Sequence, residues 1–320
     1  MRAVGIGSFA SRSSDSAHRI GREGGSIVIS YLKNRVRGYL AQLLADSNQD
    51  LRTSGSTKAS LRLLYNYYQE QAREGNNLRI GDTGLRVFSQ FEEDGILMYI
   101  FATIGTTTKS YVDVGSADGV NSNCANFALN FGWHGLCIDG NAENIKNGEA
   151  FFRNHPDTRL FPPKFVHAKV TRENTNTLIT QAGFTGEIDL LSIDIDGNDY
   201  HIWENLTAID PRVVIIETHV EFGMENIVVP YDSDYSYPGK HPQYHGASVV
   251  AMENLAKRKG YRLVGANNYG FNTIYIRNGI GEELIPGVAV ESILGHPRNR
   301  DRFELFEPIR NWDYETPLHP

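Results

Sequence analysis

Cysteine is scarce in this sequence. The sequence features that identify disulfide-rich, zinc-binding, membrane-spanning and secreted proteins are missing as well. The 320 residues include two cysteines, Cys124 and Cys137, so the chain has neither a disulfide framework nor the cysteine spacing of a zinc site. Such thiols are expected to be buried and reduced, which predicts a cytoplasmic location. No apolar run is long enough to span a membrane. The first residues include Arg2 but no apolar stretch before Ser11, which is not the pattern of a secretory signal.

Positive charge is also in short supply. Lysine and arginine number 31 against 38 aspartates and glutamates, which gives a formal net charge of −7. A protein that mainly binds phosphate backbones is usually basic, so we expect no nucleic-acid partner. The hydrophobic share of 40% and the charged share of 22% are ordinary for a globular protein with a sizeable core.

The pattern around which the chain is organised runs from residue 110 to residue 141. Tyr111, Val112 and Val114, which are aromatic or β-branched, predict a buried strand. A helix is predicted to begin near residues 121–123, and residues 136–138 predict a second strand. Gly115 and Gly119 bracket the turn after the first strand, where glycine lets the backbone approach a ligand. Asp139 ends the second strand, where a carboxylate can accept hydrogen bonds from both hydroxyls of a ribose.

This turn lacks the dinucleotide fingerprint G-x-G-x-x-G, because the second and third glycines would fall on Ala117 and Val120. Its form, an acid followed by Gly115 and Gly119, instead resembles motif I of the class I S-adenosylmethionine-dependent methyltransferases. A glycine turn in some other α/β protein is the alternative interpretation.

Strands alternate with helices along the rest of the chain. We predict an α/β fold, a Rossmann-like seven-stranded sheet of the class I methyltransferase kind, with helices on both faces and the last strand antiparallel. The further strands are predicted at residues 165–170, 188–193, 213–216, 261–264 and 273–277, and the helices between them at residues 143–152, 174–182, 200–206 and 247–259.

Three parts are predicted along the chain: an N-terminal helical extension at 1–85, a catalytic domain at 86–280, and a tail at 281–320 packed on that domain. In the extension, a loose arm at 1–25 precedes helices at 27–44 and 61–75. The first helix reads as amphipathic with a solvated basic face, the alternative being a membrane-surface helix. These helices can cover a cofactor, shape a substrate pocket or form the contact of a homo-oligomer.

Several sequence blocks together resemble the FkbM-type methyltransferases, over residues 88–278. The resemblance implies S-adenosylmethionine as cofactor and O-methylation of a hydroxyl on a sugar, glycan or glycosylated natural product. The acceptor would be a small molecule or a glycan. The blocks are residues 88–90, 93–96, 112–119, 132–136, 192–197, 214–217, 246–248 and 259–261.

The resemblance and the strand ends together predict the cofactor site. Asp113 either binds the methionine ammonium through water or ties down the glycine turn, and Lys169 and Val170 are placed beside the adenine. The predicted cofactor-binding residues are Asp113, Gly115, Ser116, Asp118, Gly119, Asn123, Asp139, Gly140, Asn141, Lys169, Val170 and Asp194.

Catalysis is assigned to the ends of the fourth and fifth strands, with Asp196 or His219 accepting the proton of the acceptor hydroxyl. The alternative is Mg²⁺ or another divalent ion held by Asp194, Asp196 and Glu217, as in O-methyltransferases of the macrocin type. Those enzymes carry paired acids after strand five, where this chain has Glu217-Thr218-His219. Acids that only stiffen the strand ends are the structural alternative.

Two further segments carry open interpretations. The irregular residues 220–245, rich in tyrosine and including His241 and His245, predict a binding loop for a sugar or polyketide. The acidic run at 92–94 reads either as a helix start or as a solvated patch. Two rival functions remain, a nicotinamide-dependent oxidoreductase and a non-catalytic cofactor-binding scaffold.

Overall fold

The computed structural model describes residue 36 and residues 51–319. The chain divides into two compact units, residues 1–57 and residues 58–320, and the second unit carries the predicted sheet. The loose arm predicted at 1–25 and the helix predicted at 27–44 lie outside the described residues, apart from Val36. The division of the chain at residues 86 and 281 stays a prediction.

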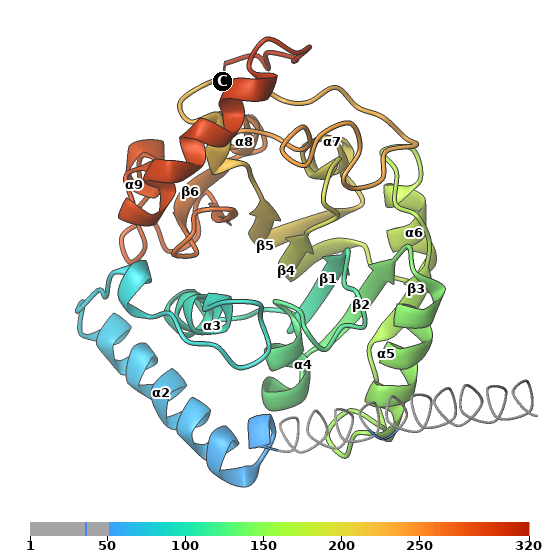
Figure 1. The fold of residues 1–320 in the computed structure, drawn as a ribbon. Coiled ribbons are helices and arrows are strands. Elements are labelled where there is room, and N and C mark those ends of the chain that lie inside the picture. Colours follow the sequence, from blue (N-terminus) through green and yellow to red (C-terminus); the bar gives the residue numbers. More distant parts are fainter. Residues whose placement is uncertain (1–35, 37–50, 320) are drawn as a thin grey trace, which may run out of the picture. The chain divides into compact units, whose positions relative to one another are not determined.

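Seven strands of the described residues form one sheet in the order β3-β2-β1-β4-β5-β7-β6 (Figure 1). The strands β1 to β5 are parallel, and β7 lies antiparallel between β5 and β6. The predicted seven-stranded sheet with an antiparallel last strand is therefore confirmed. The strands are β1 (Ser110–Val114), β2 (His134–Asp139), β3 (Lys164–His167), β4 (Gly186–Ile193), β5 (Ile209–Glu217), β6 (Tyr261–Ala266) and β7 (Asn272–Arg277).

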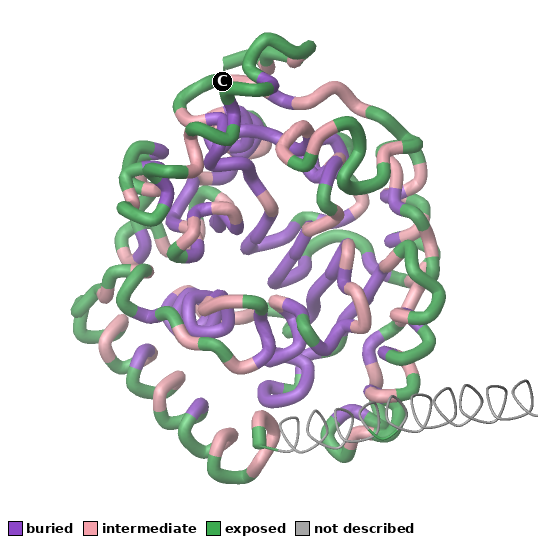
Figure 2. The backbone as a smooth tube through the Cα atoms, in the orientation of Figure 1, coloured by how far each residue is buried: buried purple, intermediate pink, exposed green. Residues whose placement is uncertain are grey.

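Helices cover both faces of this sheet, because successive strand residues point to opposite sides. Val214 and Ile216 of β5 join one apolar core with α6 to α9, whereas Val213 and Ile215 join the other core with α2 to α5. Every strand except the edge strand β3 is accordingly buried along most of its length (Figure 2). The helices are α2 (Gly55–Arg73), α3 (Glu93–Ile104), α4 (Ala125–Phe131), α5 (Ala142–Asn154), α6 (Thr175–Gln181), α7 (Asp199–Asn205), α8 (Val249–Arg258) and α9 (Val290–Leu294), with 3-10 turns η1 (Ile80–Asp82), η2 (Val220–Phe222) and η3 (Pro297–Ile309).

The burial of the cysteines and the length and polarity of the helices can be compared with the sequence analysis. Cys124 and Cys137 are both free and buried, as predicted for reduced thiols. None of the described helices combines the length and the apolar character needed to cross a bilayer.

Several element boundaries differ from the prediction: α2 begins at Gly55 rather than at 61, and β5 begins at Ile209 rather than at 213. Two of the differences lie beside the predicted site. Helix α4 begins at Ala125 rather than near 121–123, because the polar residues there hold the preceding loop: Ser122 donates to Asp113, and Asn123 donates to Ser192. Strand β3 ends at His167, so Lys169 lies beyond the strand and not at its end.

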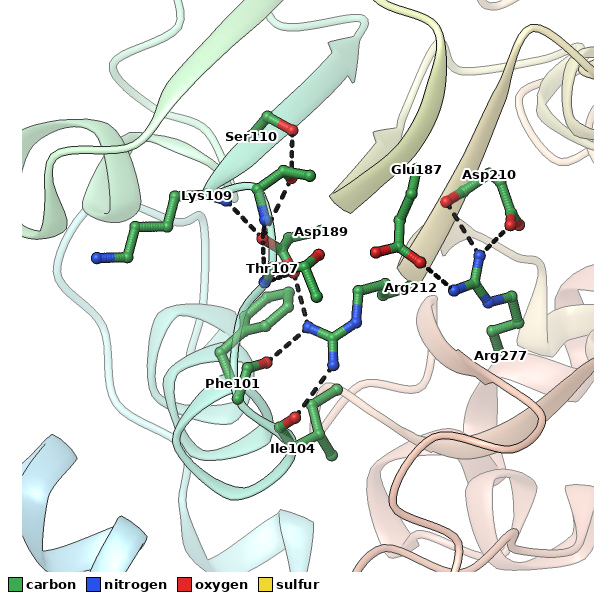
Figure 3. Close-up of polar contacts among 12 residues, drawn as sticks. Phe101, Ile104, Thr107, Lys109, Ser110, Glu187, Asp189, Asp210, Arg212 and Arg277 are labelled. Carbon is green, nitrogen blue, oxygen red and sulfur yellow. Dashed lines mark hydrogen bonds and ion pairs between the residues drawn. The ribbon is translucent and has the colours of Figure 1, made fainter.

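The amino end of the sheet is held by a buried ion pair between Asp189 of β4 and Arg212 of β5 (Figure 3). Arg212 Nη1 lies 2.7 Å from Asp189 Oδ1, and Nη2 donates to the Ile104 carbonyl at the end of α3. The Asp189 carboxylate also accepts from the backbone N–H groups of residues 107–109. This pair therefore ties α3, β4 and β5 to the loop that enters β1.

The acidic run at 92–94 starts helix α3, as one of its two interpretations predicted, but it is not a solvated patch. Asp94 is fully buried, and its Oδ2 accepts hydrogen bonds from the N–H groups of residues 87–89. Glu93 is buried too, and its Oε1 accepts from the side-chain amides of Asn267 and Asn272. These acids satisfy backbone and amide donors that would otherwise be buried without partners.

Candidate functional site

The turn after β1 passes very close to the end of β4. Gly115 has a φ of +83°, and a Cβ at this position would lie 1.7 Å from the carbonyl oxygen of Asp194. Only glycine fits a backbone approach of this kind. Ala117, two residues later, also has a positive φ of 47°. The turn thus brings the carboxyl ends of β1, β2 and β4 together.

Asp139 at the end of β2 fixes this turn from the other side. Its Oδ2 accepts from the Ala117 N–H at 2.9 Å, and its Oδ1 accepts from the Asn141 N–H at 2.7 Å. Asn141 in turn caps the start of α5, because its side-chain oxygen accepts from the N–H of Glu143. The carboxylate is therefore oriented by backbone groups while it still borders open space.

A cavity of about 710 Å³ opens between these strand ends, and we call it the switch-point cavity. It lies beside β1, where the order of the parallel strands reverses, which is the usual ligand site of open α/β sheets. The predicted site residues in its lining are Gly115, Asp139, Gly140, Asn141, Lys169, Val170, Asp194 and Asp196. The lining residues that the sequence analysis did not select as site residues include Ala117, Asn121, Asn144 and Asn198, each within a few residues of a selected one.

The other predicted cofactor residues shape the loop around this cavity without lining it. Asp113 is buried and accepts a hydrogen bond from Ser122, and burial raises the pKa of its carboxyl to about 6. Asp118 accepts from the Val120 N–H within the turn. For Asp113 this geometry matches the alternative in which it ties down the glycine turn. The remaining members of this group are Ser116, Gly119 and Asn123.

The turn after β4 is the second strained loop of the site. Asp196 has a φ of +51°, and it is exposed where it lines the switch-point cavity. Asp199 is buried and holds the turn, because Oδ1 accepts from the Ile195 N–H at 2.8 Å and Oδ2 accepts from the Gly197 N–H at 2.9 Å. Asp199 therefore positions Asp196 rather than facing the cavity.

The three carboxylates that the sequence analysis named as possible metal ligands lie close together. Two come from this turn, and Glu217 comes from the end of β5. One oxygen each from Asp194, Asp196 and Glu217 lies within 4.8 Å of the others. Burial, and then the neighbouring Asp199 and Asp196, raise the pKa of Asp194 to about 8. Burial and the charge of Asp194 also raise the pKa of Glu217 well above its usual range. A group with this charge repulsion favours either shared protons or a bound cation.

The irregular residues 220–245, which we call the insert, form the wall of a second cavity of about 500 Å³. The insert is held to the β4 turn, because Gly246 N–H donates to the Gly197 carbonyl and the Asn198 side chain donates to the Asp232 carbonyl. The ring of Tyr235 packs against Gly197 and Gly239, where a Cβ would lie 2.5 Å from ring atoms. Asn198, Tyr235 and Ser236 line both cavities, so the insert cavity adjoins the switch-point cavity.

No protein-family model matches the chain, and no curated protein matches it. The FkbM-type resemblance therefore stays a prediction.

Among solved structures, an S-adenosylmethionine-dependent methyltransferase from Clostridium acetobutylicum is 10% identical over 57% of this chain and 89% of its own, with a TM-score of 0.37. The N-terminal domain of EvdMO1, solved with SAH bound, is 14% identical over 65% of this chain and 94% of its own, with a TM-score of 0.41. An O-methyltransferase from Bacillus cereus in complex with SAH is 11% identical over 66% of this chain and 89% of its own, with a TM-score of 0.40.

TM-scores this low add no evidence about the fold beyond the strand order of the sheet. The strand order and the antiparallel β7 are those of the seven-stranded sheet that the sequence analysis predicted.

Within this sheet, the two predicted catalytic residues lie in different surroundings. Asp196 borders the switch-point cavity, whereas His219 is absent from the lining of both cavities and is buried. The His219 ring stacks on Phe222 and meets the ring of His245 edge-on at 4.1 Å between centroids. His245, which the sequence analysis noted only as part of a binding loop, is thus brought beside the strand ends by the return of the insert.

Proposed function

We propose that this protein is an S-adenosylmethionine-dependent O-methyltransferase that acts on a hydroxyl of a sugar, glycan or glycosylated natural product. The observation that carries the proposal is the pair of adjoining cavities, one at the switch point of the sheet and one under the insert. A donor in the first cavity and an acceptor in the second would meet beside Asp196 and Tyr235.

The charge of the switch-point cavity favours a cationic ligand. Asp139 and Asp196 lie in its lining against one lysine, Lys169, beside Asp194, whose raised pKa leaves it mostly protonated at neutral pH. S-adenosylmethionine carries a sulfonium and an ammonium group, which carboxylates attract. The pyrophosphate of a nicotinamide dinucleotide would be repelled here, and the glycine fingerprint that binds it is missing. These features favour methyl transfer over the oxidoreductase alternative.

The residues around the cavity suggest which parts of the cofactor each would hold. The backbone of the Gly115 turn would lie against the methionine part and the ribose, and Asp139 would accept hydrogen bonds from the ribose hydroxyls with its remaining lone pairs. Lys169 and Val170, which line the same cavity, would flank the adenine.

Methyl transfer is an in-line displacement in which the acceptor oxygen forms a bond to the methyl carbon while the carbon–sulfur bond breaks. A sugar hydroxyl is a weak nucleophile at neutral pH, so loss of its proton to a base assists the step. Asp196 is exposed at the cavity and is the proposed base. His219 borders neither cavity, so we do not assign the proton transfer to it.

The acceptor site is proposed to be the insert cavity. Its lining combines Tyr231, Tyr235 and Tyr244 with the carboxylates of Asp232, Asp234 and Asp313. Aromatic faces and carboxylates suit the apolar faces and hydroxyl groups of a sugar.

A divalent ion fits the carboxylate group at the β4 turn. Asp194, Asp196 and Glu217 would supply the oxygen ligands that Mg²⁺ prefers, and the repulsion that raises the pKa of Asp194 and of Glu217 would be relieved. Such an ion would lower the pKa of the acceptor hydroxyl. Asp196 would then act as a ligand, and the base would be another group or water.

The proposal is tested by calorimetric titration with S-adenosylmethionine and with NADH, followed by methyl transfer from labelled S-adenosylmethionine to a panel of glycosylated acceptors with and without EDTA. We expect binding of S-adenosylmethionine alone and label in at least one acceptor. Loss of turnover in EDTA would support the ion. Binding of NADH without S-adenosylmethionine would overturn the assignment, and binding without any turnover would favour the scaffold alternative.

A further inference from the structure

We infer that Glu217, His219 and His245 form a site for one divalent transition-metal ion of the zinc class. One ligand atom from each of these residues lies within 4.8 Å of the others. Two imidazoles and one carboxylate are a ligand set that zinc enzymes use, with a further position left for water or substrate. The inference rests on these side chains and does not depend on methyl transfer.

The burial of the two histidines is the main evidence that something binds here. His219 is 8% exposed and His245 is 5% exposed. Both ring nitrogens of His219, Nδ1 of His245 and Oε2 of Glu217 are buried without a hydrogen-bond partner among the described residues. Buried polar atoms nearly always have partners, so a concentration of unsatisfied ones in a single place calls for a ligand.

The surroundings of His219 orient its ring as a metal ligand requires. Its Nδ1 lies 3.6 Å from Oε2 of Glu221, which is buried and pairs through its other oxygen with Arg302. Metal-binding histidines commonly give their second N–H to a carboxylate, and Glu221 is the carboxylate placed for that role here. Because Nδ1 faces Glu221, Nε2 of His219 is the atom that would bind the ion.

This site is distinct from the oxygen-ligand group of Asp194, Asp196 and Glu217, although the two share Glu217. Imidazole ligands suit zinc and other transition metals such as copper and nickel, whereas Mg²⁺ prefers oxygen ligands alone. His245 also lines the insert cavity, and its ring stacks on Tyr235 at 6.0 Å between centroids. An ion at this position would lie at the edge of the space proposed for the acceptor.

The experiment uses the full chain, dialysed against a chelator and then titrated with Zn²⁺ and separately with Co²⁺. Calorimetry and elemental analysis give affinity and stoichiometry, and the visible absorption of Co²⁺ reports nitrogen ligation. The variants are His245→Gln, Glu217→Gln and Glu221→Gln, with Asp196→Asn for the oxygen site and His134→Gln as an exposed-histidine control. Circular dichroism of each metal-free variant checks that it is folded.

We expect one ion per chain in the unchanged protein. Glu221→Gln should weaken Zn²⁺ binding by about 10–100-fold, the usual effect of losing such a partner, and His245→Gln and Glu217→Gln by more than that. His134→Gln and Asp196→Asn should leave Zn²⁺ stoichiometry at one. The inference is overturned if Zn²⁺ and Co²⁺ do not bind, or if Asp196→Asn abolishes binding while folded His245→Gln retains it. S-adenosylmethionine titrations of the same samples show separately whether the cofactor assignment stands.

Discussion

Two residues in strained backbone conformations line the cavity proposed for the cofactor. Ala117 and Asp196 both have positive φ without being glycine, and both line the switch-point cavity. Such conformations cost about 1–3 kcal/mol each and persist where the surrounding structure imposes them. Here Asp139 holds the Ala117 N–H and Asp199 holds the turn around Asp196, so the strain is maintained by specific hydrogen bonds.

Replacing Gly115 by alanine should destabilise the protein far more than the same change at Gly132. Both glycines have positive φ, and an alanine at Gly132 meets nothing within 4 Å. Gly132→Ala should therefore cost only the left-handed conformation, about 1–2 kcal/mol. Gly115→Ala adds a backbone clash, and we expect a loss of about 2–5 kcal/mol in the free energy of unfolding. Urea denaturation measures both, and equal losses would contradict the close approach to β4.

Asp196→Asn tests the proposed base. Asparagine tolerates the left-handed conformation, so the variant should fold and still bind S-adenosylmethionine, with a loss of affinity from the missing charge that is small beside the loss of turnover. The turnover number should fall by about 10²–10⁴-fold, the usual effect of losing a general base. Steady-state kinetics and calorimetry separate the two effects, with the exposed Asp301→Asn as a control. Undiminished turnover in Asp196→Asn would place the base elsewhere.

At the scale of the elements, the two edges of the sheet have different roles. The carboxyl edge carries the strained turns and both cavities, whereas the amino edge carries the Asp189–Arg212 pair that joins α3, β4 and β5 (Figure 3). A second arginine at the same edge, Arg277, pairs with Glu187 and Asp210 but is partly exposed. The burial of the first pair and the exposure of the second predict different contributions to stability.

Arg212→Met should lower the free energy of unfolding by about 3–5 kcal/mol, because it leaves the Asp189 charge buried without its partner. Arg277→Met should cost about 0–1 kcal/mol, since exposed ion pairs contribute little. Chemical denaturation of the two variants compares the free energies of unfolding after the same substitution, arginine to methionine, in the buried and in the partly exposed pair. A loss of under 1 kcal/mol for Arg212→Met would mean that Asp189 is adequately held by the backbone N–H groups alone.

At the scale of the whole molecule, the strand ends that make the switch-point cavity belong to a sheet with an apolar core on each face. A ligand that binds these ends should therefore stabilise the sheet as a whole, since it binds the folded state and not the unfolded one. The stabilisation is about 2.7 kcal/mol when the ligand is at a hundred times its dissociation constant.

S-adenosylmethionine at that concentration should raise the melting temperature of the full chain by roughly 5 °C or more. NADH at the same concentration should leave it unchanged, because the acidic cavity disfavours its pyrophosphate. Differential scanning calorimetry with both ligands makes the measurement. A rise with NADH, or none with S-adenosylmethionine, would count against the donor site.

Much of the fold could be predicted from local sequence. The alternation of apolar residues along strands and helices depends on neighbours in the chain, so β1, β2, β4 and β5 were correctly expected, as was the closing pair β6 and β7. The position of Gly115 and Asp139 at strand ends also followed, because both come directly after apolar runs. Parallel strands share one edge for their carboxyl ends, which placed Asp194, Asp196 and Glu217 near one another before any coordinates.

Only the folded chain decides which polar side chains face the cavity. Asp113, Asp94 and Asp199 look like site residues or surface acids in the sequence, yet each is buried and accepts hydrogen bonds that hold a turn or helix start. The approach of His245 to Glu217, and of Arg212 to Asp189, joins residues more than twenty positions apart. Those distances depend on how strands and the insert pack, and no local pattern of residues encodes them.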